Sequence, residues 1–277
     1  MTSPATTLHK LVNQPENWDF SGAGKLYAGV DLGTYKAITI IVDETGRPRA
    51  ARMRRAEVVR SGLIVDYAGA QNLVREMIEE MRKAASLTID KGATSFPPQT
   101  ESANINATRY LLEGAGLEVL AVLDEPTAAN QVLKLDNAAI VDVGGGTTGI
   151  AVIQDGAVVF TDDEATGGVH LSLVVAGNHK ISYEEAEQLK TDPGKSREIV
   201  PIVRPVIEKI AGIVDDCLKK FDDLTEVCLV GGTCELEGFE KIVQETLRMR
   251  VFRPPTPQFI TPLGIALSCL DENGPPG

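Results

Sequence analysis

Hydrophobic and polar positions follow one order of elements twice along the chain. From Lys25 an apolar strand ends at Asp31, a second strand follows at 36–43, and a third comes after a short turn. The same order returns from residue 138, where the first strand of the group ends at Asp142. An internal duplication is the simplest explanation, and it predicts two similar α/β halves that face each other across a cleft.

Apolar residues recur at helical spacing between and after these strands. Within 70–85, for example, five apolar residues fall on one helical face. Other helices are expected at 103–116, 126–135, 171–179, 183–190, 198–221, up to about 247 and 262–270, and further strands at 118–125 and 225–230. Pro205 inside the longest helix predicts a kink. Residues 1–24 carry proline and glycine among polar side chains, a pattern typical of a tail or flexible arm.

Composition narrows the class of protein. The chain has 277 residues, 43% hydrophobic and 24% charged, which suits two modest soluble domains. The net charge of −12 disfavours nucleic acid and anionic membranes as partners, and no apolar run approaches the roughly 20 residues that span a bilayer. Arginines at 47–60 are interrupted by Glu57 and are interpreted as a solvated hairpin face. Four cysteines without metal-ligand spacing fit reduced, buried thiols in a cytoplasmic protein.

The two turns after the aspartates carry the candidate chemistry. Gly33 and Thr34 follow Asp31, and a run of three glycines and a threonine follows Asp142. A turn of this composition exposes backbone N–H groups that suit phosphate oxygens, while the aspartates are expected to hold a divalent cation such as Mg²⁺. One such turn is a common hairpin feature, but two at matched positions of a duplicated unit predict a clamp on a polyphosphate.

Two other phosphate-binding motifs are excluded. The segment 144–149 satisfies G-x-G-x-x-G by letter, but the chain continues as a hairpin, whereas a dinucleotide-binding loop must open a helix. The sequence contains no G-x-x-x-x-G-K-[ST] motif either, so it is not a P-loop protein.

A set of motifs in chain order resembles the actin/DnaK-type ATPase superfamily. They are YAGVDLGTYKAITIIV, DEPTAA, DVGGGTTGIAV, TGG, CLVGGT and PLGIAL, within about residues 25–270. Within the superfamily the sequence most resembles the EutJ family, chaperone-like proteins associated with bacterial ethanolamine catabolism. SGLIVDYAGAQNLV also resembles a region of FtsA, PilM and MreB. The resemblance implies two duplicated ribonuclease H-like domains without the large subdomain insertions. It implies these boundaries: a 1–24 extension, domain I at 25–134 with 262–277 returning to it, and domain II at 135–261.

The resemblance also implies roles for particular residues, with ATP and Mg²⁺ as cofactors. Asp31 and Asp142 match the residues that hold the metal, and Glu125 matches a water-orienting carboxylate, although a carboxylate at a helix start also has a purely local explanation. The implied nucleotide contacts are Gly33, Thr34, Tyr35, Gly144, Gly145, Gly146, Thr147, Glu187, Lys190, Gly231 and Gly232. On sequence alone, Glu187 and Lys190 are equally a surface ion pair. Gly264 and Ala266 match a motif of interdomain helix packing.

Departures from the superfamily limit the expected activity. Only some ten residues follow the third strand where DnaK-type proteins carry a subdomain, and the catalytic lysine of those chaperones has no aligned match. TDPGKSR (191–197) alone stands where relatives insert another subdomain, and His170 stands where many have an acidic residue. A shallower cleft excludes water poorly, which predicts slow hydrolysis or binding without turnover.

Three functions follow from the resemblance. The first is a chaperone-like ATP-binding protein of ethanolamine utilisation whose protein partner, an ethanolamine lyase or a microcompartment component, reads the nucleotide state. The second is a PilM- or FtsA-like assembly module with structural nucleotide, in which residues 1–24 bind a partner. The third is a small-molecule kinase. Oligomers are compatible with all three, and a cytoplasmic location, with or without microcompartment association, fits them.

Overall fold

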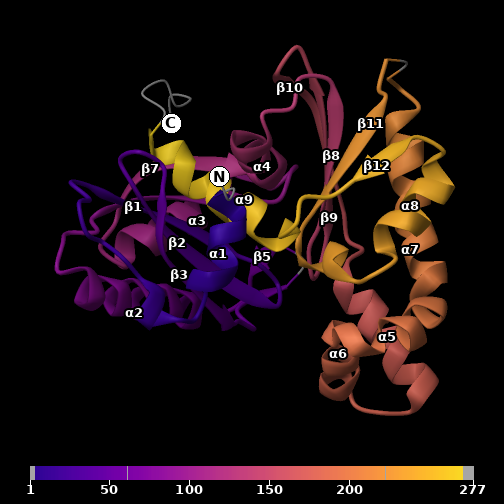
Figure 1. The fold of residues 1–277 in the computed structure, drawn as a ribbon, viewed down its shortest axis with the longest axis horizontal. Helices are drawn as coiled ribbons and strands as arrows, with labels where there is room; N and C mark the ends of the chain where they lie inside the picture. Colours follow the sequence, from indigo (N-terminus) through magenta and orange to yellow (C-terminus); the bar gives the residue numbers. More distant parts are fainter. Residues whose placement is uncertain (1–3, 61, 222, 271–277) are drawn as a thin grey trace. The chain divides into compact units, whose positions relative to one another are not determined.

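The computed structural model describes residues 4–60, 62–221 and 223–270. The chain separates into two compact units (Figure 1). Unit 1 comprises Met1–Lys134 together with Phe259–Gly277, and unit 2 is the intervening segment Leu135–Gln258. Unit 1 is therefore built from two separate stretches of sequence, whereas unit 2 is continuous.

Unit 1 is built on a five-stranded sheet. Its strands are β1 (Leu26–Leu32), β2 (Lys36–Asp43), β3 (Pro48–Arg55), β6 (Lys91–Phe96) and β7 (Glu118–Asp124), in the order β3-β2-β1-β6-β7. The first three pair antiparallel, and β6 and β7 continue parallel to β1. A short hairpin of β4 (Val59–Arg60) and β5 (Leu63–Ile64) leads into the first long helix.

Helices cover both faces of this sheet. One face carries α2 (Tyr67–Ala85) and α3 (Ser102–Gly114), whose apolar residues share one core with β1. On α2, Val74, Ile78 and Met81 are fully buried, and Asp66 caps its start by accepting a hydrogen bond from the Gly69 N–H at 2.9 Å. The other core contains residues of α4 (Glu125–Leu133) and α9 (Ile260–Leu267).

Two glycines allow α9 to lie directly on its neighbours. A Cβ at Gly264 would lie 1.7 Å from the carbonyl oxygen of Ala128 on α4. A Cβ at Gly29 on β1 would lie 2.4 Å from the backbone nitrogen of Ala266. Both distances are far below van der Waals contact, so these positions require glycine. The motif that contains Gly264 and Ala266 thus packs within unit 1.

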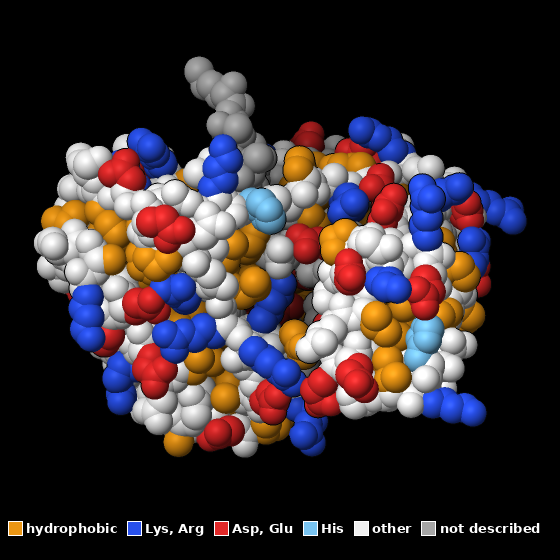
Figure 2. Space-filling view, turned by 60° about the horizontal axis from the view of Figure 1, so that its bottom comes forward, with side chains coloured by type: hydrophobic (Ala, Val, Ile, Leu, Met, Phe, Trp, Pro, Cys, Tyr) orange, Lys and Arg blue, Asp and Glu red, His pale blue; other side chains and the backbone are white. Residues whose placement is uncertain are grey.

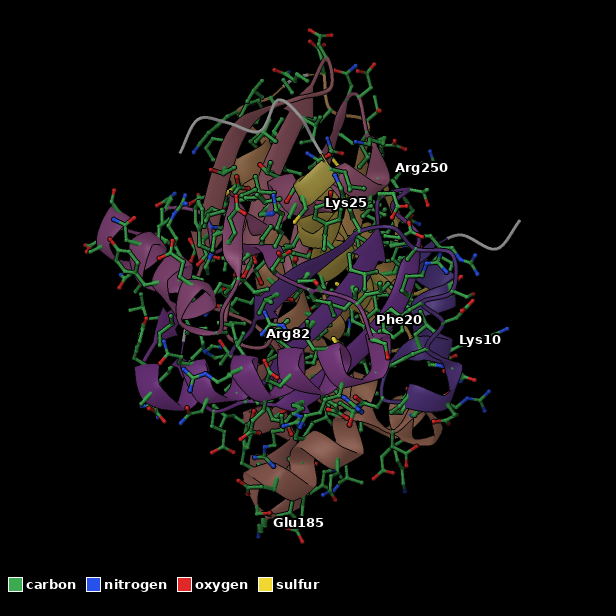
Figure 3. The ribbon with its side chains drawn as sticks, turned by 90° about the vertical axis from the view of Figure 1, so that its left-hand side faces the viewer. Lys10, Phe20, Lys25, Arg82, Glu185 and Arg250 are labelled. Carbon is green, nitrogen blue, oxygen red and sulfur yellow. The ribbon has the colours of Figure 1, made fainter. Side chains whose placement is uncertain are left out.

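The N-terminal segment is part of unit 1 and not a free tail over its described residues. Helix α1 (Pro4–Leu11) packs against β3, with Leu8 fully buried and Leu11 6% exposed. The indole N–H of Trp18 donates to the Leu11 carbonyl at 2.9 Å, and Trp18 and Phe20 pack against the unit 1 core. Lys10 and Phe20 mark this segment in Figure 3. The expectation of a flexible arm was wrong because its few apolar residues cover the edge strand β3.

Unit 2 repeats the sheet of unit 1. Its strands are β8 (Ala138–Val143), β9 (Thr148–Gln154), β10 (Ala157–Glu164), β11 (Glu226–Val230) and β12 (Arg250–Phe252), in the order β10-β9-β8-β11-β12. The first three are again antiparallel and the last two parallel to the first of them. The two sheets therefore have the same topology, as the duplicated sequence pattern predicts.

The helices of unit 2 enclose one large core. They are α5 (Gly168–His179), α6 (Tyr183–Thr191), α7 (Ser196–Leu218) and α8 (Phe239–Leu247). Ser182 and Glu185 form a capping box at the start of α6, and Figure 3 shows Glu185 at the outside of that helix. Helix α7 contains Pro201 as well as Pro205, and helical structure is continuous through both. Across both units the described residues also form short 3-10 segments: η1 (Pro15–Asn17), η2 (Pro193–Lys195), η3 (Gly232–Glu235), η4 (Pro257–Phe259) and η5 (Ser268–Leu270).

The connections at the two places where the family resemblance predicts missing insertions are short. Among the described residues, the β4–β5 hairpin is the one element between β3 and α2 in unit 1, and η2 is the one element between α6 and α7 in unit 2. The fold class predicted from sequence is therefore confirmed, including the missing insertions. Among the described helices, none combines the length and apolar composition needed to cross a membrane.

The arginines at 47–60 do not form a uniform solvated face. Arg49 is 7% exposed and its guanidinium lies 2.7 Å from the Asp43 carboxylate. Arg52 pairs with a glutamate of α2 and lies 4.9 Å from the centre of the Trp18 ring. The neighbouring arginines also pair with glutamates, and the face drawn in Figure 2 shows basic and acidic side chains interspersed. Burial of Arg49 corrects the sequence expectation, because its carboxylate partner lies across the hairpin.

Candidate functional site

The glycine-rich turn of unit 2 connects β8 and β9. Asp142, 7% exposed, stands one residue before the end of β8, and Thr148 begins β9. The turn is closed by a hydrogen bond from the Gly144 N–H to the Thr147 carbonyl at 3.0 Å. The four residues Gly144 to Thr147 therefore reverse the chain, and they begin two residues after a buried carboxylate.

The carbonyl groups of this turn point to the start of α5. The Gly144 oxygen accepts from the Gly168 N–H at 3.0 Å, and the Gly145 oxygen accepts from the Val169 N–H at 2.8 Å. Gly167 permits this approach, since a Cβ there would lie 2.8 Å from both turn oxygens. Two of the N–H groups that a helix start leaves without intrahelical partners are thus used by the turn.

The geometry of the peptide group then fixes where the turn N–H groups point. In a planar trans peptide, the C=O and the following N–H point in opposite directions. With the Gly144 and Gly145 carbonyls directed at α5, the N–H groups of Gly145 and Gly146 are directed away from it. Neither donates to a backbone acceptor in the described part of the chain. Two successive N–H groups that point away from α5 in this way suit an anion such as a phosphate.

The Gly231–Gly232 turn meets the glycine-rich turn from another element. The Thr233 hydroxyl donates to the Gly144 oxygen at 2.7 Å. Gly231 has φ of +90°, and a Cβ there would lie 2.4 Å from the Asp142 carboxylate. Gly232 is the first residue of η3. The structure thus places Gly231 and Thr233 beside Asp142 and Gly144.

Glu187 and Lys190 form an ion pair, but a buried one. The Lys190 ammonium lies 2.7 Å from the Glu187 carboxylate, and the two side chains are 9% and 8% exposed. Lys190 also donates to the Gly168 oxygen at 3.1 Å, and Ser172 donates to Glu187. Burial lowers the pKa of Lys190, opposed by the Glu187 charge. The two residues do form an ion pair, but it does not lie on the surface, because α6 packs against α5 and buries it.

Asp163 is a site residue that sequence reasoning missed. On the sheet, Gly149 pairs with Asp142 on one side and with Asp163 on the other. Directly paired residues face the same side, and Gly149 has no side chain to separate the two carboxylates. Burial, together with the Asp142 charge and against a hydrogen bond from Thr147, raises the pKa of Asp163 to about 6. One of its carboxylate oxygens is buried without a partner among the described residues.

The corresponding turn of unit 1 has the same closure. The Gly33 N–H donates to the Lys36 carbonyl at 3.1 Å, so glycine and acceptor stand two and five residues after Asp31, the same offsets as in unit 2. Asp31, Gly33, Thr34 and Tyr35 are all half-buried. The Tyr35 carbonyl accepts from the Ala56 N–H at 3.0 Å, and its ring lies 5.3 Å from the Arg55 guanidinium.

Glu125 begins α4 at a pocket of unit 1. The N-cap role belongs to Asp124, which accepts from the Thr127 N–H at 2.9 Å, so the helix start does not depend on Glu125 for capping. Glu125 lines a cavity of about 80 Å³ together with Leu32, Ser95 and Asn104. A half-buried carboxylate therefore lines this cavity.

The carboxylates beside the glycine turns fit Mg²⁺ only when phosphate oxygens and water supply its other ligands. No group of three or more His, Cys, Asp or Glu side chains in the described ranges is arranged as a metal site. Asp31 and Asp142 each stand two residues before the first glycine of the turn in their own unit. In phosphate sites Mg²⁺ is typically held by one or two carboxylates plus phosphate oxygens and water. The residues present therefore fit a metal that arrives with a polyphosphate.

Sequence comparison decides the family. The Escherichia coli K12 ethanolamine utilization protein EutJ is 44% identical over 245 residues, which cover 88% of this chain and 86% of that protein. The chain belongs to the EutJ family. The crystal structure of EutJ from Carboxydothermus hydrogenoformans matches with a TM-score of 0.88 and 42% identity, over 95% of this chain and 97% of that one.

The EutJ family lies within a wider group of actin-like ATPases. The MreB/Mbl protein family model matches residues 45–195, and the cell division protein FtsA model matches residues 139–264. MreB5 of Spiroplasma citri, solved with ADP, has a TM-score of 0.69 at 16% identity, covering 87% of this chain and 95% of that one. A type IV pilus PilM–PilN complex has a TM-score of 0.73 at 15% identity, covering 88% and 98%. At these identities the two structures show the shared fold.

Proposed function

We propose that this EutJ-family chain is an ATP-binding, chaperone-like protein of ethanolamine utilisation. In this proposal the glycine turn of each unit binds phosphate oxygens of Mg-ATP, hydrolysis is slow or absent, and a protein partner binds according to the nucleotide present. The observation that carries the proposal is the pair of Gly145 and Gly146 N–H groups that point away from α5, held by the α5 contacts of the Gly144 and Gly145 carbonyls. The matching closure at Gly33 and the ADP bound by MreB5 support it.

Each site residue has a definite part in this proposal. The N–H groups of the two turns bind phosphate oxygens, with Thr34, Tyr35 and Thr147 beside them. Asp31 and Asp142 hold hydrated Mg²⁺, which when bound neutralises phosphate charge. Glu125 accepts a hydrogen bond from a water molecule and orients it. Gly231 and Gly232, without side chains, leave room for the nucleoside.

Slow turnover follows from the short connections at β4–β5 and η2. Subdomains in these places would enclose the nucleotide and exclude water, which strengthens electrostatic stabilisation of the transition state. Without them we expect the chain to bind nucleotide and to hydrolyse it slowly or not at all.

Calorimetric titration with Mg-ATP and Mg-ADP tests binding. We expect wild-type protein to bind both, EDTA to weaken binding, and Asp142→Asn to weaken it by about tenfold or more, the loss of about 1.4 kcal/mol for one charged contact. Asp216→Asn is the matched control, because that carboxylate is 78% exposed in the same unit. If the wild type gives no binding heat and no thermal stabilisation at millimolar nucleotide, the proposal is refuted.

Nucleotide-dependent capture tests the partner. The tagged chain, with and without ATP, is mixed with purified ethanolamine lyase and with individual microcompartment shell proteins. Capture of one of them that changes with ATP and is lost in Asp142→Asn is expected. Capture that is the same with ATP, with ADP and in Asp142→Asn would contradict a nucleotide-read interaction.

A PilM- or FtsA-like assembly module is the second candidate, favoured by the PilM match and the FtsA family model. Here the nucleotide is structural and a surface carries the function. Because Leu8 and Leu11 belong to the core of unit 1, deletion of residues 1–24 would confuse partner loss with unfolding. Lys10→Glu changes an exposed position of α1 instead. Loss of partner binding at unchanged ATP affinity would favour this candidate, and an unchanged interaction would count against the N-terminal segment as its partner surface.

A further inference from the structure

A chain of buried hydrogen bonds holds the carbonyl groups behind the glycine-rich turn of unit 2. The Gly144 oxygen accepts from the Thr233 hydroxyl at 2.7 Å in addition to the Gly168 N–H. The Gly168 oxygen in turn accepts from the Lys190 ammonium at 3.1 Å. The Lys190 ammonium also donates to the carboxylate of Glu187, on the same helix α6, at 2.7 Å.

Two side chains from different elements converge on one glycine of this chain. A Cβ at Gly168 would lie 2.5 Å from the Thr233 hydroxyl and 3.2 Å from the Lys190 ammonium. Gly168 is therefore enclosed between η3 and α6. Thr233 and Glu187 are 8% and 6% exposed, so water competes poorly for these bonds. The orientation of the Gly144 peptide is thus set by side chains that lie behind the turn.

We propose that Thr233 and Lys190 are positioning residues that aim the Gly145 and Gly146 N–H groups at the phosphates of the ligand. They act through the Gly144 and Gly168 carbonyls and do not touch the ligand's phosphates themselves. This proposal rests on the proposed function, because it needs a polyphosphate at the turn. It gives Lys190 and Glu187 a different part from the nucleoside contact that the family resemblance implies.

A phosphate ligand without a nucleoside separates the two roles. If Lys190 acts through the turn, removing its charge weakens binding of Mg-pyrophosphate and Mg-ADP by the same factor. If it contacts the nucleoside, only Mg-ADP binding weakens. Both affinities are measured by calorimetric titration, and glycine-selective ¹⁵N NMR spectra report whether the turn amides shift with each ligand.

Thr233→Val and Thr233→Ser form the decisive pair. Valine keeps the shape and loses the hydroxyl, whereas serine keeps the donor, so we expect about a three- to tenfold loss for valine with both ligands and recovery with serine. Thr246→Val is the control, because it removes a hydroxyl bond to the Ile242 carbonyl on α8 at 3.0 Å. It should leave both affinities unchanged.

Several outcomes would overturn the positioning role. Unchanged affinity in Thr233→Val, an equal loss in Thr246→Val, or a Lys190→Met loss confined to Mg-ADP each contradicts it. If Lys190→Met does not fold, the Thr233 pair still decides. Failure of the proposed function is distinguishable, since the wild type would then bind neither Mg-ADP nor Mg-pyrophosphate.

Discussion

Replacing Asp163 with asparagine should stabilise unit 2 at neutral pH. Its carboxyl shares the face of the sheet with Asp142, and burial is the main cause that raises its pKa from 3.8 to about 6. An ionised group held in this environment opposes folding. Asparagine has nearly the same shape, can accept the hydrogen bond from Thr147, and carries no charge.

The sign and size follow from linkage. Below pH 3.8 the carboxyl is protonated in both states and contributes nothing. Between pH 3.8 and 6 the unfolded chain ionises first, so stability falls as pH rises, and above pH 6 the full penalty remains. The interval from 3.8 to about 6, at 1.36 kcal/mol per unit of pH, corresponds to about 3 kcal/mol. The variant should gain roughly this amount at pH 8 and nothing at pH 3.5.

Thermal unfolding in EDTA from pH 3.5 to pH 8 provides the assay. Trp18 is the single tryptophan and lies in unit 1, so its fluorescence follows that unit, while circular dichroism follows both. A gain of about 3 kcal/mol raises the melting temperature of a unit of this size by roughly 10 °C. The gain should be larger in the dichroism signal than in the Trp18 signal. A difference between Asp163→Asn and wild type that does not change with pH, or a less stable variant at pH 8, would refute the reasoning. Asp216→Asn should show little gain at any pH.

Three further predictions concern packing and thiols. Gly264→Ala places a Cβ 1.7 Å from the Ala128 oxygen and should cost unit 1 about 3 kcal/mol or more, read by Trp18 fluorescence in urea. Gly212→Ala, with open space in a helix of unit 2, should gain about 0.5–1 kcal/mol, read by circular dichroism in urea. Stability of the first variant equal to wild type would contradict the α4–α9 contact. Leu8→Ala should cost about 2–5 kcal/mol in the same assay, and a neutral result would mean that α1 is not docked on β3. All four cysteines are buried with raised pKa values, so a thiol reagent should titrate them only in denaturant, and rapid native reaction would contradict their burial.

The sequence predicted the fold well because the signals were local. The strand, aspartate, turn and strand pattern occurs twice, and each copy depends on apolar runs and turn residues close in the chain. Strand β6 was not predicted, because KGATSF (91–96) contains lysine, glycine and serine and resembles a loop. It is a central strand, and a Cβ at Gly92 would lie 2.7 Å from the Ala28 oxygen. The need for glycine there comes from a neighbour 64 positions earlier.

The candidate site was predictable where chemistry and spacing coincide. The glycine turns and the two aspartates were recognised from adjacent residues. Asp163 was not, because its meaning depends on the register that sets it opposite Gly149. Thr233 was likewise missed, because its hydroxyl reaches a carbonyl 89 residues away in sequence. Burial of the Glu187 pair also depends on how α6 packs against α5.

The return of the chain to unit 1 affects the order of events during synthesis. Unit 2 is continuous from Leu135 to Gln258, so all of its residues have been made before the ribosome reaches α9. Unit 1 lacks the helix that lies on Gly29 until those last residues emerge. The unit that is translated first is therefore completed last, and until then its β1 face stays open to wrong partners.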